Sequence, residues 1–113
     1  MSSDDSHIPF AIRPLDRATF SAMKAAKTDL WQGEHLFVGL NCFEPGQSQT
    51  PHVHGGADKF DLILSGRARL TVGAESREAG PGTVIWAPAD VAHGVDEALE
   101  RTVMLVAIAP PPR

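Results

Sequence analysis

The chain has 113 residues, of which 42% are hydrophobic and 21% charged, and its formal net charge is −4. This length suits one domain with one core, and the acidic balance gives no basic surface for nucleic acid or an anionic membrane. The lone cysteine, Cys42, excludes an internal disulfide framework and fits a reducing compartment. Because the N-terminus is polar and no apolar run is long enough for a bilayer, we expect a cytoplasmic protein.

The N-terminal region predicts an arm over residues 1–15 and then a segment with two interpretations. Residues 16–27 contain good helix formers, and Asp16 is a suitable N-cap, so a short N-terminal helix is one interpretation. The alternative is extended structure over residues 22–31, because tertiary contacts override helix propensity in small β domains. We favour the extended interpretation.

The rest of the chain predicts short strands separated by turn residues. The apolar or alternating runs cover residues 36–43, 60–64, 67–72, 75–79, 83–87 and 102–109. Strands this short and this regularly spaced are typical of an all-β sandwich or barrel. We expect a barrel over residues 16–109. The prolines of residues 110–113 cannot pair in a sheet, so the tail is expected to be an extended or frayed end.

Histidines mark the candidate site. His52 and His54 are separated by one residue, and residues i and i+2 of a strand point to the same side. His93 follows the strand-like run 83–87 and a turn, so a sheet folded to bring the two strands face to face would add a third imidazole. Three converging imidazoles bind a divalent transition metal such as iron, zinc, nickel or manganese. Without this convergence they are scattered histidines, as expected for His7 and His35 at the surface.

Glycine, histidine and proline follow two spacings in this region. The first is a glycine, five residues, His-x-His, eleven residues and a glycine; the second is a glycine, five residues, a proline, four residues and a histidine. The residues at these positions are Gly46, His52, His54 and Gly66 for the first, and Gly82, Pro88 and His93 for the second. The pattern resembles the two motifs of the cupin superfamily, over residues 46 to about 97. The resemblance implies a small single-domain double-stranded β-helix, or jelly-roll barrel, with positive φ at Gly46 and Gly66.

Three positions depart from the motifs of the family. Lys59 stands where the family has a glutamate, the usual fourth metal ligand, and Asp90 and Glu97 stand where it has a glycine and an asparagine. Three neutral histidines leave the full +2 charge on the ion. At about 4 Å and an effective dielectric of roughly 20, an ammonium at residue 59 is repelled by a divalent ion by about 8 kcal/mol. A protonated Lys59 therefore needs compensation.

Two aspartates flank Lys59 and offer that compensation. Lys59 and Asp61 share one strand face, so both point into the barrel if the register follows the family. Asp61 either pairs with Lys59 or takes the vacant metal position, and Asp58 adds a second negative charge. Lys59 either snorkels to the barrel mouth and stays solvated, or its ammonium binds the carboxylate or enolate of a small substrate beside the metal. A base role with a lowered pKa is a further branch. Lys59 and Asp61 are our candidate catalytic residues.

The opposite face of the same strand is wholly apolar. Phe60, Leu62 and Leu64 form a row that needs a cover, either the second sheet or another subunit. Small cupins are often dimers, so the resemblance implies a homodimer with this row as the first candidate interface. Phe43 and Trp86 are expected in the core or in a pocket wall.

Two classes of function fit these residues. The first is a dioxygenase, in which three histidines leave metal positions open for a small enol, diketone or thiol substrate and for dioxygen. The second is a barrel that binds a metal or small ligand without turnover, as a sensor or store. The chain has no tyrosine, which excludes the Cys–Tyr crosslink of some oxygenase relatives and the tyrosine acid of some isomerase relatives. An isomerase is therefore the weakest of the alternatives.

Overall fold

The computed structural model describes residues 10–112. Within this range the chain forms nine strands and one short 3-10 helix, so the predicted all-β class is confirmed. The elements are η2 (Pro14–Arg17), β1 (Ala26–Gln32), β2 (Phe37–Phe43), β3 (Gln49–His52), β4 (Asp58–Ser65), β5 (Ala68–Val72), β6 (Glu75–Ala79), β7 (Val84–Ala87), β8 (His93–Ala98) and β9 (Thr102–Ala109). Over the same residues, no helix combines the length and the hydropathy needed to cross a membrane.

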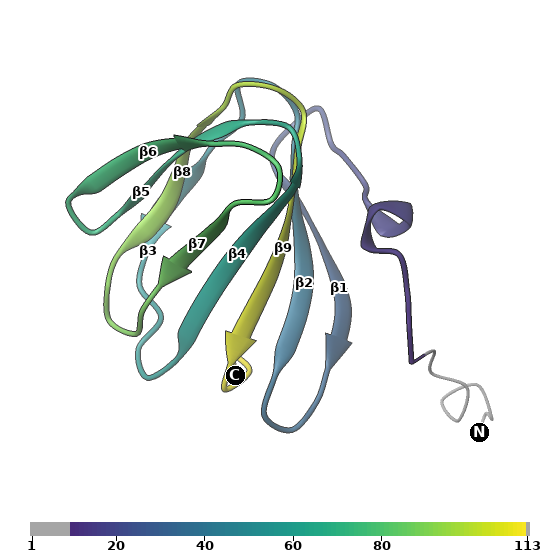
Figure 1. The fold of residues 1–113 in the computed structure, drawn as a ribbon, viewed down its shortest axis with the longest axis vertical. Helices are drawn as coiled ribbons and strands as arrows, with labels where there is room; N and C mark the ends of the chain where they lie inside the picture. Colours follow the sequence, from purple (N-terminus) through teal and green to yellow (C-terminus); the bar gives the residue numbers. More distant parts are fainter. Residues whose placement is uncertain (1–9, 113) are drawn as a thin grey trace.

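The strands form two antiparallel sheets that pack face to face as the predicted jelly-roll barrel (Figure 1). The five-stranded sheet has the order β1-β2-β9-β4-β7, and the four-stranded sheet has the order β3-β8-β5-β6. Turns with positive φ join several strands, and the φ values of 87° at Gly46 and 85° at Gly66 confirm the prediction for both residues. A side chain at Gly66 would meet the backbone of Arg101 and Thr102, so glycine is also needed there for space.

The apolar core fills one end of the space between the sheets. Along β4 the inward residues are Lys59, Asp61 and Ile63, all nearly inaccessible to solvent. Ile63 belongs to the core, whereas Lys59 and Asp61 lie toward the other end. The core consists of Phe43, Ile63, Ala68, Leu70, Ala79, Val95, Ala98 and Met104. A smaller apolar cluster lies at that end too, and it contains Val106 and Ile108, the β9 partners of Asp61 and Lys59, so the two buried charges lie beside an apolar wall.

The segment before β1 is not a regular helix. Between residue 10 and β1, only Pro14–Arg17 form a 3-10 turn; the extended interpretation is correct for the strand itself, but β1 begins at Ala26, four residues later than predicted. Ala18 and Phe20 pack on the outer face of the five-stranded sheet, against a cluster that includes Cys42. Pairing of β1 with β2 and burial of this segment therefore outweigh the helix propensity of residues 16–27.

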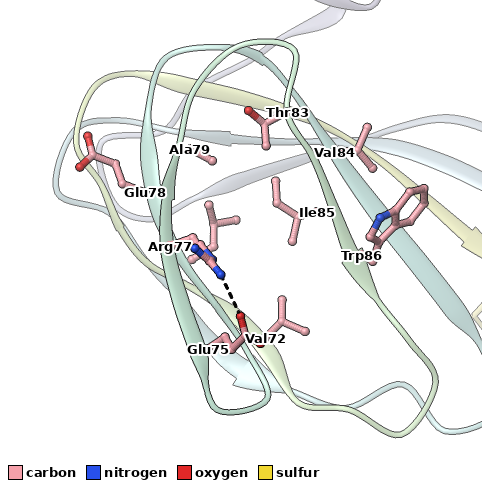
Figure 2. Close-up of a pocket in the computed structure, with 10 residues that line it drawn as sticks. Val72, Glu75, Arg77, Glu78, Ala79, Thr83, Val84, Ile85 and Trp86 are labelled. Atoms are coloured by element: carbon pink, nitrogen blue, oxygen red, sulfur yellow. Dashed lines mark hydrogen bonds and ion pairs between the residues drawn. The ribbon is translucent and has the colours of Figure 1, made fainter.

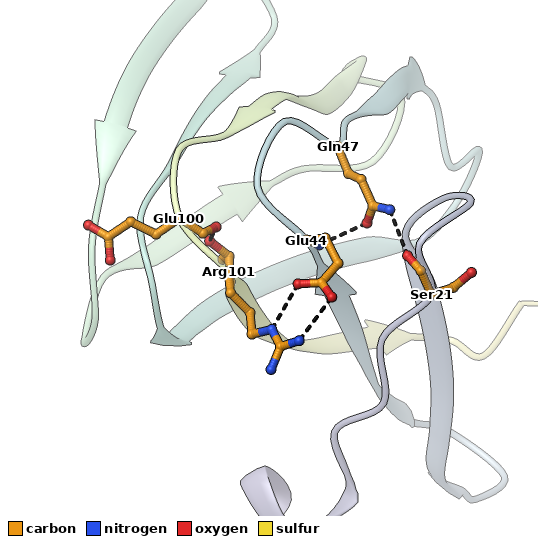
Figure 3. Close-up of polar contacts among 6 residues, drawn as sticks. Ser21, Glu44, Gln47, Glu100 and Arg101 are labelled. Carbon is orange, nitrogen blue, oxygen red and sulfur yellow. Dashed lines mark hydrogen bonds and ion pairs between the residues drawn. The ribbon is translucent and has the colours of Figure 1, made fainter.

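Polar contacts fasten this N-terminal segment to the barrel (Figure 3). The Arg101 guanidinium donates to both carboxylate oxygens of Glu44, at 2.8 and 2.9 Å, and lies 4.2 Å from the centre of the Phe20 ring. The Gln47 amide donates to the Ser21 carbonyl at 2.7 Å, while its oxygen accepts from the Glu44 backbone N–H at 2.8 Å. The hydrogen bonds from Arg101 lower the pKa of Glu44. The segment is thus tied to the β2–β3 and β8–β9 connections.

The outer faces of the two sheets differ in polarity. The four-stranded sheet carries exposed ion pairs, including Arg69 with Glu97 at 3.6 Å, so Glu97 is accommodated at a solvated surface. The five-stranded sheet presents the half-buried row that contains Phe60, beside Trp86, which is 68% exposed. Phe43 lies in the core, whereas Trp86 borders an open groove. Of the N-terminal segment, the part from residue 10 onward covers only part of this apolar face.

One of the three C-terminal prolines is packed against the barrel, whereas Pro110 and Pro112 are exposed. Pro111 is buried, and Pro112 lines a cavity between the sheets. The prediction that the tail cannot pair in a sheet agrees with the structure, because β9 ends at Ala109. The prolines contribute apolar surface to the barrel end instead.

Candidate metal centre

Strand pairing brings His52 and His93 together. The two residues are direct cross-strand partners of β3 and β8 in the four-stranded sheet, and their ring centroids are 4.3 Å apart. The prediction that facing strands carry them is therefore corrected: they lie on neighbouring strands of one sheet, where side chains are closer than across a barrel. His54, just beyond the end of β3, has its ring centroid 4.9 Å from that of His52 and 5.3 Å from that of His93.

The imidazoles are oriented as metal ligands. Each of the three histidines offers a ring nitrogen within 4.8 Å of the others, and two bonds of about 2.1 Å at a tetrahedral angle separate ligand nitrogens by roughly 3.4 Å, so small side-chain shifts would close the cluster on one ion. His52 Nδ1 donates to the Thr50 carbonyl at 3.2 Å, and His93 Nδ1 donates to the Val91 carbonyl at 3.1 Å. A carbonyl only accepts, so the proton is on Nδ1 and the Nε2 lone pair is free.

One buried nitrogen supports this fit directly. His93 Nε2 is inaccessible to solvent and has no hydrogen-bond partner among residues 10–112. A buried polar atom without a partner is costly and calls for an explanation. A metal ion held by the three imidazoles would bind the Nε2 lone pair and so explain this buried atom. The residues present therefore fit a divalent transition metal.

Burial keeps two of the rings neutral. It lowers the pKa of His93 to about 4, against the hydrogen bond to Val91, which raises it. Burial also lowers the pKa of His54, with smaller contributions from the charges of His52, Lys59 and Lys27. A neutral imidazole is the form that binds a metal.

The turn that delivers His93 is held in place by its neighbours. The Asp58 carboxylate accepts a hydrogen bond from the Ala89 N–H at 2.9 Å, and the Asp90 N–H donates to the His54 carbonyl at 3.1 Å. Asp90 has φ 67°, which explains why the family uses glycine here; aspartate tolerates this conformation better than most residues.

The role of Asp58 was missed by the sequence reasoning. Its carboxylate is not a second compensating charge for Lys59, since it binds the turn instead. The contact joins residues 31 positions apart, so only the pairing of β4 with β7 discloses it.

Lys59 and Asp61 face the histidines from the five-stranded sheet. Their side chains are 2% and 6% exposed, and Lys59 Nζ lies 3.3 Å from Asp61 Oδ1. Both therefore point into the barrel, and the snorkelling alternative for Lys59 is wrong. The carboxylate of Asp61 does not belong to the cluster of converging imidazole nitrogens. Its Oδ1 makes no well-aligned hydrogen bond within the described residues, and burial raises its pKa, against the opposing charge of Lys59.

A cavity of about 270 Å³ opens beside this site. It is lined by residues of β1, β2, β3, β4 and β9 and by the C-terminal prolines. These residues are Lys27, Thr28, Asp29, Phe37, Gly39, Leu40, Asn41, Gln49, His52, His54, Lys59, Val106, Ile108 and Pro112. The cavity is small for a ligand site, so it suits a small molecule.

A larger groove lies elsewhere and does not include the histidines (Figure 2). It has a volume of about 460 Å³ and runs between β7 and the hairpin of β5 and β6. Its charged residues are exposed, and Arg77 pairs with Glu75 at 3.2 Å. Nothing in the groove converges on a common point, so size alone does not locate the chemistry.

Fold and site together define a small jelly-roll barrel with a three-histidine candidate metal centre. Residues 39–109 match the model of the cupin domain, and the chain belongs to the cupin family. Over 79 residues it is 37% identical to the uncharacterized protein SCO3923 of Streptomyces coelicolor, covering 68% of this chain and 72% of that one.

Solved structures support the same family. The chain resembles TT1209 from Thermus thermophilus, with 38% identity, a TM-score of 0.82 and coverage of 89% of this chain and 98% of that one. It also resembles an RmlC-like cupin protein from Desulfovibrio desulfuricans, with 25% identity, a TM-score of 0.80 and coverage of 90% and 97%.

Proposed function

We propose that the protein binds one divalent transition-metal ion through His52, His54 and His93. The convergence of these three ring nitrogens, with His93 Nε2 buried and without a partner, is the observation that carries the proposal. Imidazole nitrogens suit iron, zinc, nickel and manganese, so metal availability decides among them.

Metal analysis of protein purified without a polyhistidine tag tests this proposal. We expect close to one ion per chain for the wild type and loss of the ion in His52→Ala and His93→Ala. His35→Ala is the matched control, because the side chain of His35 is 88% exposed and lies outside the cluster. Full metal content in both ligand variants would refute the site.

We propose a dioxygenase reaction for the loaded site, with a small enol, diketone or thiol as substrate. A bound ion supplies Lewis acidity and, if it is iron, manganese or nickel, coordination positions for substrate and dioxygen. Both oxygen atoms enter the product in such a reaction, so no separate electron donor is needed. We assign Lys59 and Asp61 as the candidate catalytic residues. Lys59 lies opposite the histidines and would stabilise negative charge on a substrate oxygen, while Asp61 holds its ammonium.

A barrel that binds its ligand without turnover is the second candidate function. It is favoured by Lys59, which stands where the family supplies a fourth ligand. Oxygen consumption by iron-loaded protein against small diketones, thiols and flavonols separates the two. Uptake that depends on His93 supports the dioxygenase, and no uptake with a full complement of iron supports the binding role.

We also propose that the protein is a cytoplasmic homodimer. The free, buried thiol of Cys42 is compatible with a reducing compartment. The uncovered apolar face around Phe60 and Trp86 supports a second copy as the partner. A twofold contact pairs a patch with itself, and the exposed Asp58 at the edge of this patch is held by the Ala89 N–H.

A further inference from the structure

A lysine whose side chain is almost inaccessible to solvent, Lys59, lines the cavity beside the histidines. A lysine ammonium has three N–H donors. Within residues 10–112, the only ion pair of the Lys59 ammonium is with Asp61, at 3.3 Å, although the Lys59 side chain is 2% exposed. The Asp61 oxygen in this contact lacks a well-aligned hydrogen bond. The pair is therefore incompletely satisfied, and the remaining donors of Lys59 are available to a ligand in the cavity.

Charge balance points to an anion. The Lys59 and Asp61 charges cancel, and three neutral imidazoles add none, so an ion bound at the histidines leaves the site with a net charge of about +2. Lys27 and Asp29 both line the cavity and their opposite charges cancel, so the net charge comes from the bound ion, while the charges of Lys59 and Lys27 both act on His54. A ligand with two negative oxygens neutralises the loaded site, whereas a neutral ligand leaves it positive.

The cavity also limits the size and the polarity of that ligand. Its volume of about 270 Å³ admits only a small molecule. Val106 and Ile108 provide an apolar wall, and Asn41 and Gln49 provide amide groups. This lining fits a short carbon skeleton with polar ends.

We propose that the cavity binds a small 2-oxo or enol carboxylate whose carboxylate accepts hydrogen bonds from Lys59 Nζ. The second oxygen of this ligand points toward the histidines, so the inference rests on the proposed metal site and names the class of its substrate. The carboxylate is the permanent anion, and it supplies the acceptor that the Lys59 ammonium lacks. Asp61 then acts as a positioning residue that fixes the ammonium for the ligand.

The test compares pyruvate with pyruvamide, which has nearly the same shape but no charge. Backbone amide shifts of ¹⁵N-labelled protein are titrated with each probe, in metal-free and in zinc-loaded protein. We expect pyruvate to bind at least about tenfold more tightly than pyruvamide in both forms, as a charge-assisted hydrogen bond implies. The Lys59→Met/Asp61→Asn double variant removes both charges together and is expected to lose this preference. Lys24→Met, in an exposed loop outside the cavity, is expected to keep it.

Each outcome bears on the proposal. Equal affinities in the metal-free wild type, or no binding of either probe, overturn it, as does a preference that persists in the double variant. A second readout does not need a variant: the ¹H–¹³C signal of the Lys59 ε-methylene should shift with pyruvate and not with pyruvamide. If the proposed metal site is wrong, metal analysis will find no ion in the wild-type protein. The titration of metal-free protein still tests the binding of pyruvate in that case.

Discussion

The imidazoles of two histidines in the cluster are held by the same kind of local hydrogen bond. In His52 and His93 alike, Nδ1 is held by the backbone carbonyl two residues earlier, and Nε2 is directed away from the strand. This contact fixes the tautomer and the ring orientation without a side-chain partner. At the scale of the residue, the site is therefore preformed, and the departure at Lys59 is its most unusual feature.

Replacing Lys59 by glutamate is expected to tighten metal binding. The change removes a positive charge beside the ion and adds the ligand type that the family uses there, so we expect an increase in affinity of about tenfold or more. Competition with a chromophoric chelator measures it, and Lys24→Glu controls for the change in net charge. Weaker binding would mean that residue 59 does not occupy the glutamate position.

At the scale of the element, the turn before β8 is the part that positions His93. The turn bonds to the carboxylate at the start of β4 and to the carbonyl of His54, so three segments meet at the cluster. One of these hydrogen bonds is accepted by a side chain and the other by the backbone, and together they join the turn before His93 to the segment that carries His54. A change in the turn should therefore act on metal affinity rather than on the global fold.

Asp58→Ala is expected to weaken metal binding by roughly 10–100-fold, as the loss of an outer contact to a metal site does. Asp58→Asn keeps an oxygen acceptor for the Ala89 N–H and should retain most of the affinity. Chelator competition and the melting temperature of the metal-free protein are measured together. Equal metal affinities for the two variants would contradict the positioning role.

The sequence predicted the strands that have regular patterns better than those that do not. Residues 75–79 and 102–109 were predicted with the observed bounds, because turn residues or a continuous apolar run define them. β8 was not predicted, since His93–Ala98 carries glycine and two acids and reads as a loop. A strand was expected to carry both His52 and His54, but β3, which contains Pro51, ends at His52, so His54 lies beyond it.

For the site, the motif spacing was sufficient to select the three histidines. The motif register and the alternation of side chains along a strand were sufficient to place Lys59 and Asp61 inside the barrel. The spacing was not sufficient to assign His52 and His93 to one sheet, because register between distant strands leaves no local pattern. The Lys59–Asp61 pair was one of two alternatives, and the 3.3 Å contact together with the absence of Asp61 from the histidine cluster decided between them.

At the scale of the whole molecule, one outer face is apolar and the other polar, and this difference predicts a dimer formed through the apolar face. We expect the wild type to have twice the chain mass in light scattering after gel filtration. Trp86→Glu places a charge in the exposed part of the apolar face and should weaken association by at least about tenfold. Ser76→Glu adds the same charge on the polar sheet and should leave the mass unchanged. A monomeric wild type would contradict the dimer.

The attachment of the N-terminal segment is expected to depend on pH. Arg101 lowers the pKa of Glu44, so the folded state binds this proton less readily than the unfolded chain. The contribution of the pair to stability is therefore present above the ordinary value of 4.5 and is lost as the pH falls through the lower folded pKa. Arg101→Met should give a small decrease in melting temperature at pH 7 that disappears in acid. A decrease that is equal at both pH values would contradict this linkage.

The packing of the C-terminal prolines has a practical consequence for purification. Pro112 shares a cavity wall with His52 and His54, so a polyhistidine tag joined after it would begin at the entrance to the cluster. Imidazoles delivered there would compete for the same ion and would inflate stoichiometry measured on tagged protein. Affinity handles belong at the opposite terminus, and a cleavage site should precede any metal count.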